Sequence, residues 1–157
     1  MKASLLLAAL LAAGSASAAG NTGVSIQAAQ RYAAFWNTGD PALAKQALSP
    51  DFIDRTLPAG REQGPNGPLQ ASLGFRTAVP DLKAEVTHLI ADGDQVTLRL
   101  HFTGHFTGHF GAVQGAGQVI DFQAFDLYRV ADGRIAENWH LEDNLTLLRQ
   151  MGIIPAQ

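Results

Sequence analysis

The sequence contains no cysteine among its 157 residues. Disulfide bonds and thiolate catalysis are therefore excluded, and the fold must depend on burial of apolar side chains. Hydrophobic residues make up 46% of the chain and charged residues 16%, which is typical of a globular domain with a full core. Clusters of basic residues are also absent, and the formal net charge is -3. We therefore expect no nucleic-acid partner.

A long apolar run occurs only at the N-terminus. A basic residue precedes the run at 5–13, and small residues follow it. This order is typical of a secretory signal peptide, and the run is short for a membrane-spanning helix. The alternative is a buried N-terminal helix, but the run has no polar face. We expect cleavage near Ala18 to remove residues 1–18 and leave 19–157 as one periplasmic or secreted domain without a membrane partner.

Helix signals fill the first half of the remaining chain. Ser25 fits an N-cap, because apolar residues follow at three- and four-residue spacing as far as Trp36. Asp40 fits the cap of a second helix, since a proline occupies the first helical position after it. A third helix is predicted to begin at Pro68 and to end before Pro80.

In the second half of the chain, apolar residues recur at every second position, which is typical of strands. Strands are predicted at 84–91, 96–107, 118–130 and 134–142, followed by a short helix capped by Asp143. Helices followed by an antiparallel meander predict an α+β fold. A strongly curved sheet that is covered by helices on one face would enclose a pocket.

The stretch HFTGHFTGHFG at 101–111 places three histidines at a spacing of four. Its glycines and threonines disfavour a helix, and it continues the period-two pattern of the strand. In a strand, His101 and His105 would lie about 13 Å apart, because each residue rises about 3.3 Å. One metal ion cannot bind both, so we expect no metal site here. The histidine side of the strand is then either a surface or the polar wall of a cavity.

The last predicted hairpin brings Asp126 close to His140, and the turn sets their register. A two-residue turn would place Asp126 opposite Trp139. A three-residue loop, with Gly133 as a bulge, would place Asp126 opposite Asn138 and make His140 its diagonal neighbour, about 7 to 8 Å away. We favour the three-residue loop because it separates polar from apolar side chains more cleanly.

In this register the two faces of the hairpin differ in polarity. One face holds Phe122, Ala124, Asp126, Tyr128, Asn138 and His140, and the other holds Phe125, Leu127, Ile135, Trp139 and Leu141. The apolar face needs a cover, and a homodimer through this outer face of the sheet would provide one. A carboxylate near an imidazole can set its tautomer and suits a general acid/base. The alternative is a buried Asp–His hydrogen bond without chemistry.

Four segments in this order resemble one protein family: FWNTGDPALAKQALSPDF, FRTAVPDL, GDQVTLRLHFTG and DLYRVADGRIAENWHLEDNLTLLRQMG. From about Ser25 to Ile154 the chain resembles the SnoaL-like polyketide cyclases, also called ester cyclases. The resemblance implies the cone-shaped nuclear-transport-factor-two-like fold. In that fold, N-terminal helices pack on a strongly curved mixed, mostly antiparallel sheet that encloses a pocket.

The resemblance also implies a reaction type. Cyclases of this family close a ring by intramolecular aldol condensation, without a metal or a cofactor. Their acid/base Asp lies on the last strand, where this chain has His140, and their supporting His lies on the preceding strand, where it has Asp126. Ala124 replaces a polar pocket residue of the best-known cyclases, and Asp54 stands where they have an Asn.

These observations predict an exported protein that performs acid/base chemistry on a small, largely apolar carbonyl compound. The reaction would be an aldol-type cyclisation, an isomerisation or lactone chemistry, with His140 as general acid/base oriented by Asp126. The predicted substrate-binding residues are Asn138, Tyr128, Asp54, Phe122, Ala124 and Trp36. Two alternatives remain, since a fold does not fix a function. One is a non-catalytic protein that binds a small molecule in the same pocket, and the other is an accessory subunit that works through its apolar sheet face.

Overall fold

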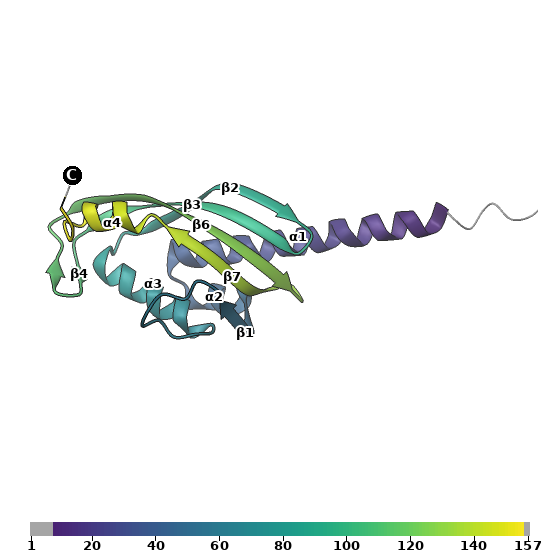
Figure 1. Ribbon diagram of the computed structural model, residues 1–157, viewed down its shortest axis with the longest axis horizontal. Helices are drawn as coiled ribbons and strands as arrows, with labels where there is room; N and C mark the ends of the chain where they lie inside the picture. Colours follow the sequence, from purple (N-terminus) through teal and green to yellow (C-terminus); the bar gives the residue numbers. More distant parts are fainter. Residues whose placement is uncertain (1–7, 156–157) are drawn as a thin grey trace, which may run out of the picture.

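The computed structural model describes residues 8–155, and their side chains from Asn21 onward (Figure 1). Its helices are α1 (Ala8–Thr38), α2 (Pro41–Ala47), α3 (Asn66–Ala78) and α4 (Asn144–Gln150). Its strands are β1 (Leu48–Asp54), β2 (Lys83–Asp92), β3 (Gln95–Phe106), β4 (His109–Phe110), β5 (Val113–Gln114), β6 (Gln118–Ala131) and β7 (Arg134–Glu142).

Five strands form one mixed sheet in the order β1-β7-β6-β3-β2, while β4 and β5 form a small separate hairpin. The β1–β7 pair is parallel, and the other pairs of the main sheet are antiparallel. Figure 1 shows this sheet arched over α1, α2 and α3, curled but not closed. The predicted α+β fold, with helices on one face of a strongly curved sheet, is confirmed.

The first helix is longer than predicted. It begins at Ala8, and Ser25 lies inside it, where its hydroxyl donates to the Asn21 carbonyl oxygen at 2.9 Å. The prediction that Ser25 caps this helix is therefore wrong. Figure 1 shows the N-terminal part of α1 extending past the edge of the sheet. Part of the predicted signal peptide, residues 1–7, lies outside the described residues.

The other helix ends follow local signals. Asp40 caps α2, because its carboxylate accepts a hydrogen bond from the backbone N–H of Ala42 at 2.9 Å. The third helix, α3, begins two residues before the predicted Pro68. In the described part of the chain, no helix is both long enough and apolar enough to cross a membrane.

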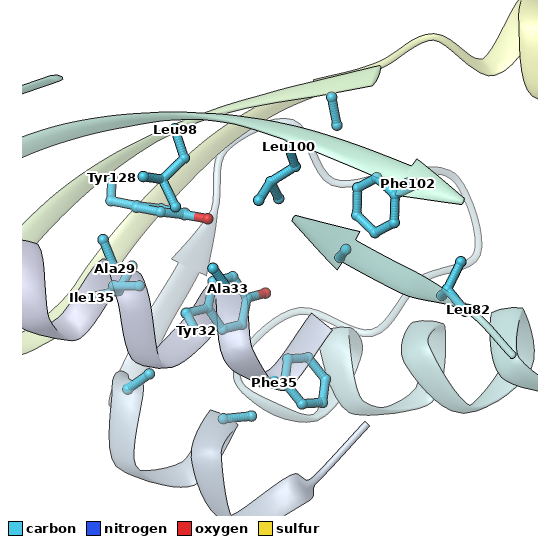
Figure 2. Packing of buried hydrophobic residues seen from close by; sticks show 14 of the residues in the cluster. Ala29, Tyr32, Ala33, Phe35, Leu82, Leu98, Leu100, Phe102, Tyr128 and Ile135 are labelled. Carbon is cyan, nitrogen blue, oxygen red and sulfur yellow. The ribbon is translucent and has the colours of Figure 1, made fainter. Parts of the chain in front are cut away.

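The core lies between α1 and the inner face of the sheet (Figure 2). Small side chains at Ala29 and Ala33 let α1 approach the sheet closely, and both are buried. Between them Tyr32 packs edge-on against Tyr128 of β6, with ring centroids 5.7 Å apart. Figure 2 shows Leu98, Leu100 and Phe102 of β3 facing the same helix. The alternation predicted for this strand is therefore present.

The β6–β7 hairpin has a register that neither prediction anticipated. Its turn has two residues, Asp132 and Gly133, whose φ angles of 50° and 73° fit a hairpin turn of the primed type. The register then shifts by one residue at Ala136 on β7, which is a β-bulge. As a result, Asp126 lies directly opposite His140. The predicted three-residue loop is wrong.

The bulge also changes one face assignment. Ile135 was predicted on the outer face, but it precedes the bulge and is fully buried in the core. The other predicted members of the outer face keep their positions, because they lie beyond the bulge or on β6. Phe125 is 51% exposed and Leu141 is 74% exposed, so the outer face carries an apolar patch on β6 and β7 that is uncovered within one chain.

The histidine repeat forms the end of β3 and the start of a glycine-rich segment. Its first two histidines lie on the outer surface and pair with carboxylates: His101 with Asp121 at 2.8 Å and His105 with Asp81 at 2.7 Å. The histidine side of this strand is therefore a surface and not a cavity wall.

The glycines of the repeat allow β3 to end against α3. The backbone N–H of Gly108 donates to the Ala78 carbonyl oxygen at 2.9 Å, and a Cβ on Gly108 would collide with the Thr77 carbonyl oxygen.

We expect Gly108→Ala to lower the free energy of unfolding by about 1 to 3 kcal/mol, because the added methyl group would displace the backbone of α3. Urea denaturation would measure the loss. Gly23→Ala, where a Cβ has no neighbour within 4 Å, is the control and should not destabilise. Equal stability of the two variants would contradict the prediction.

Candidate active site

A cavity of about 610 Å³ lies between the inner face of the sheet and the helices. This volume suits a small organic ligand. Most of its wall is apolar and aromatic: Tyr32, Trp36, Phe52, Phe75, Leu100, Phe102, Phe110, Phe122, Leu147 and Leu148. The rings of Phe102 and Phe122 stack on the wall with centroids 5.0 Å apart. The polar cluster of the cavity consists of Asp54, Arg61, Asp126, Asn138, His140 and Glu142.

The imidazole of His140 lies between two carboxylates. Its Nδ1 is 2.7 Å from Glu142 Oε1, and its Nε2 is 3.1 Å from both carboxylate oxygens of Asp54. Glu142 shares a face with His140 because it follows two residues later on β7. Asp54 arrives from β1, which runs parallel to β7 and pairs with it through Asn138.

This geometry fixes the charge of His140. A carboxylate only accepts hydrogen bonds, so each ring nitrogen must carry a hydrogen, and the ring is an imidazolium. Burial alone would lower the pKa of His140, but the hydrogen bonds and charges of Glu142 and Asp54 outweigh burial and raise that pKa to about 9. The side chain is only 6% exposed. His140 therefore carries a positive charge at neutral pH and has no free lone pair.

Backbone and side-chain groups of the loop after β1 hold this arrangement. The backbone N–H of Thr56 donates to Asp54 Oδ1 at 2.9 Å, and the Thr56 hydroxyl accepts from the backbone N–H of His140 at 2.9 Å. Gln63 bonds the backbone of Asp54 twice, accepting from its N–H at 2.8 Å and donating to its carbonyl oxygen at 3.0 Å. The Asp54 carboxylate is thus fixed on the imidazolium.

Asp126 lies in the same cavity but has different partners. Its Oδ1 accepts a hydrogen bond from Asn138 Nδ2 at 3.0 Å, and the residue is 6% exposed. Burial raises the pKa of Asp126 to about 6, although the bond from Asn138 and the charge of His140 act in the opposite direction. Within residues 21–155, no hydrogen bond joins Asp126 to His140. The predicted orienting bond between them is therefore replaced by the bonds of His140 to Asp54 and Glu142.

Most of the predicted substrate-binding residues line the cavity: Trp36, Asp54, Phe122, Ala124 and Asn138. Tyr128 does not, since it is fully buried behind the wall, and its hydroxyl has no hydrogen bond of standard geometry. Its predicted contact with a substrate oxygen stays a prediction, and the structure places its hydroxyl next to Asp126 instead of on the cavity wall. The Oδ1 atom of Asn138 is also buried without a partner among the described residues.

Sequence reasoning gave no role to two charged residues of the polar cluster, Glu142 and Arg61. Glu142 had a usable signal, because residues two apart on a strand share a face, and His140 was already a candidate. Arg61 had none, because it lies on a loop without periodicity. No group of three potential ligand side chains in the described part of the chain is arranged to hold a metal ion.

Comparisons with known proteins agree with the resemblance. A family model described as SnoaL-like polyketide cyclase matches residues 26–151. A solved structure from Bacillus cereus, provisionally named a polyketide cyclase, is 45% identical with a TM-score of 0.77, over 84% of this chain and 83% of that chain. No curated protein matches the chain.

Two further solved structures are more distant. IdmH from Streptomyces antibioticus, a provisionally named polyketide cyclase, is 26% identical with a TM-score of 0.72, over 82% of this chain and 98% of that chain. AclR from Streptomyces galilaeus, a provisionally named hydroxylase, is 26% identical with a TM-score of 0.76, over 87% of this chain and 85% of that chain. The family match covers most of the sequence, and the fold and cavity agree with it. This chain belongs to the SnoaL-like polyketide cyclase family.

Proposed function

We propose that this protein is an acid/base enzyme that moves a proton next to the carbonyl group of a small, largely apolar compound, using side chains and no metal or cofactor. The observation that carries the proposal is the buried Asp126 carboxylate on the cavity wall, with its pKa raised to about 6. A base whose pKa lies near the working pH is effective in proton transfer. The reaction would be an aldol-type cyclisation, an isomerisation or lactone chemistry.

The geometry favours Asp126 over His140 as the base. Both ring nitrogens of His140 already donate to carboxylates, whereas Asp126 has one standard hydrogen bond, from Asn138, and a weaker interaction with the Tyr128 hydroxyl. In the proposed step, Asp126 accepts a proton from the carbon beside the substrate carbonyl, and the electrons of the broken C–H bond form an enolate. The imidazolium opposite Asp126 favours this negative charge. The neutral Asp126 then returns the proton to the product.

The names of the relatives support a small organic substrate but not one reaction. IdmH and the Bacillus cereus protein are provisionally named polyketide cyclases, and AclR is provisionally named a hydroxylase. One fold therefore carries two reaction names, so the chemistry of this chain has to be argued from its own polar cluster.

Hydrogen–deuterium exchange tests the proposal without knowledge of the natural substrate. The ketone 2-tetralone would be incubated with the protein in D2O, and loss of its proton signals beside the carbonyl would be followed by NMR. We expect exchange faster than in buffer alone, because Asp126 removes these protons reversibly. Exchange at the buffer rate, with 2-tetralone bound, would instead identify a non-catalytic binding protein.

We also propose that the protein is exported and loses its N-terminal segment. The apolar run precedes the part of α1 that packs in the core, where Ala28 and Ala29 are buried, so cleavage near Ala18 would leave that part intact. Intact mass spectrometry of protein recovered from the periplasm or medium should give a chain that begins at Ala19. A full-length mass, or protein found only in the cytoplasm, would contradict this proposal.

A homodimer through the outer face of the sheet is proposed as well. This face exposes Phe125, Trp139 and Leu141, and a second copy would remove their apolar surface from water. Sedimentation velocity at micromolar concentration should show a dimer for the native protein and a monomer for Leu141→Glu. Leu73→Glu, at an exposed position on α3 in the helical layer, is the control and should remain dimeric. A native monomer would contradict the proposal.

A further inference from the structure

Arg61 brings a second positive charge to the polar cluster. It lies on the loop between β1 and α3, lines the cavity, and has a side chain that is 25% exposed. Its Nη1 is 3.9 Å from Asp54 Oδ2, which is beyond hydrogen-bond distance. The guanidinium makes no hydrogen bond within residues 21–155. The donors of this cavity cation are thus available to a ligand.

The loop holds Arg61 in place on both sides. Its backbone N–H donates to the Pro58 carbonyl oxygen at 3.1 Å. Two residues later, Gln63 bonds the backbone of Asp54 twice, and the intervening Glu62 accepts from Gln70 Nε2 of α3 at 2.9 Å. These tethers fix the start of the Arg61 side chain, so a ligand that meets the guanidinium does not have to order the loop first.

The charge of the guanidinium also acts across the cavity. It favours the charged forms of Glu142 on β7 and of Tyr32 on α1, which both line the cavity. Arg61 and His140 carry two positive charges at pH 7, against three negative charges on Asp54, Glu142 and the mostly ionised Asp126. A ligand anion is therefore favoured only beside Arg61, whose hydrogen-bond donors are free.

Three other arginines of the chain show how this side chain can be satisfied. Arg55 and Arg129 both bond Glu137 on the outer face, each through Nε at 2.5 Å. Arg76 donates to the carbonyl oxygens of Trp36 and Leu82. Arg61 makes no hydrogen bond of either kind among the described residues, and its ion pair with Asp54 is long, at 3.9 Å. A guanidinium in a partly desolvated site binds carboxylates strongly, because its planar N–H groups match both oxygens.

We propose that Arg61 binds a carboxylate group of the substrate, so that the substrate is a small oxo acid with an apolar body. The carbonyl part of this inference rests on the proposed function. The aromatic wall around Phe102 and Phe122 would hold the body, the carbonyl group would lie by Asp126, and the carboxylate would face the loop. Arg61 thereby selects acids over the corresponding esters.

Isothermal titration calorimetry at pH 7 with two matched probes tests this inference. The probes are 3-benzoylpropionate and its methyl ester, which differ in the charge that Arg61 would recognise. We expect the native protein to bind the acid at least about tenfold more tightly than the ester, a difference that one charged hydrogen-bonded contact can supply. Arg61→Gln should lose about tenfold in affinity for the acid and change affinity for the ester by less than about twofold.

Arg99→Gln is the control and should leave both affinities unchanged, because Arg99 lies on the outer side of β3, where it donates to Thr87 of β2. Three results would overturn the inference. The native protein could bind the acid and the ester with equal affinity, it could fail to bind the acid, or Arg61→Gln could lose the same affinity for both probes. The experiment measures binding alone. Failure here with continued exchange of 2-tetralone protons would remove the role of Arg61 and leave the acid/base proposal standing.

Discussion

Replacing Asp126 with asparagine is expected to stabilise the protein and to remove its proton-transfer activity. The asparagine has the same shape and can still accept the hydrogen bond from Asn138, but it carries no charge and takes up no proton. Exchange of 2-tetralone protons should fall about 100- to 10,000-fold, the usual contribution of a general base. Asp121→Asn, on the exposed outer side of the same strand, is the control and should keep the native rate.

The stability gain follows from the raised pKa of Asp126. Its pKa in the folded state is about 6, above the ordinary value of 3.8, so folding favours the neutral form. The contribution of neutral Asp126 to the free energy of unfolding is fully present below about pH 3.8. It is lost as the pH rises through 6, because the buried carboxyl then becomes charged. Above pH 7, Asp126→Asn should therefore raise the free energy of unfolding by about 2 to 3 kcal/mol, because a pKa shift of about two units corresponds to a free energy of this size.

Chemical denaturation of the native protein and Asp126→Asn at pH 4 and pH 8 measures this difference. The two proteins should be nearly equal in stability at pH 4, and the variant should be more stable at pH 8. A variant that is less stable at pH 8, or one that keeps native exchange activity, would contradict the role given to this carboxylate.

Replacing His140 with glutamine is expected to produce the largest loss of stability. The change leaves Asp54 and Glu142 without the cation they share, and the Asp54 side chain is only 3% exposed. Removing one partner of a buried ion pair costs about 3 to 5 kcal/mol, because the remaining charge stays buried. The exposed pair of His105 and Asp81 provides the control, and His105→Gln should cost less than about 1 kcal/mol.

The pH dependence of this loss has a definite sign. The pKa of His140 is about 9 in the folded state and 6.5 ordinarily, so the stability it contributes is complete below about pH 6.5 and is lost as the pH rises through 9. The gap between the native protein and His140→Gln, measured by urea denaturation, should narrow from pH 6 to pH 9.5. A gap that widens over this range would show that His140 is neutral in the folded protein.

Most of the fold could be predicted because its signals are local. Alternation of apolar residues along β3 put Leu98, Leu100 and Phe102 on the buried face, and all three are buried. The pattern of Asp40 followed by a proline marked the start of α2. The resemblance to a family then supplied the curvature of the sheet and the pocket, which local patterns alone do not determine.

The register of the site could not be predicted. The bulge at Ala136 shifts the pairing of β7 with β6 by one residue, and nothing in the adjacent sequence marks it. It moves Asp126 opposite His140 and turns Ile135 into the core. The contact between Asp54 and His140 spans 86 residues and depends on the parallel pairing of β1 with β7, which no short-range pattern encodes. The roles within the site therefore had to come from the structure.

The charge of His140 is the most direct test of the account, because a fixed imidazolium leaves Asp126 as the base. Nitrogen-15 NMR of the His140 ring across pH 5 to 8 would measure it. The structure predicts that both ring nitrogens remain protonated over this range, since each donates to a carboxylate. A His140 ring that loses its proton near pH 6.5 would contradict the account and would return the role of base to the imidazole.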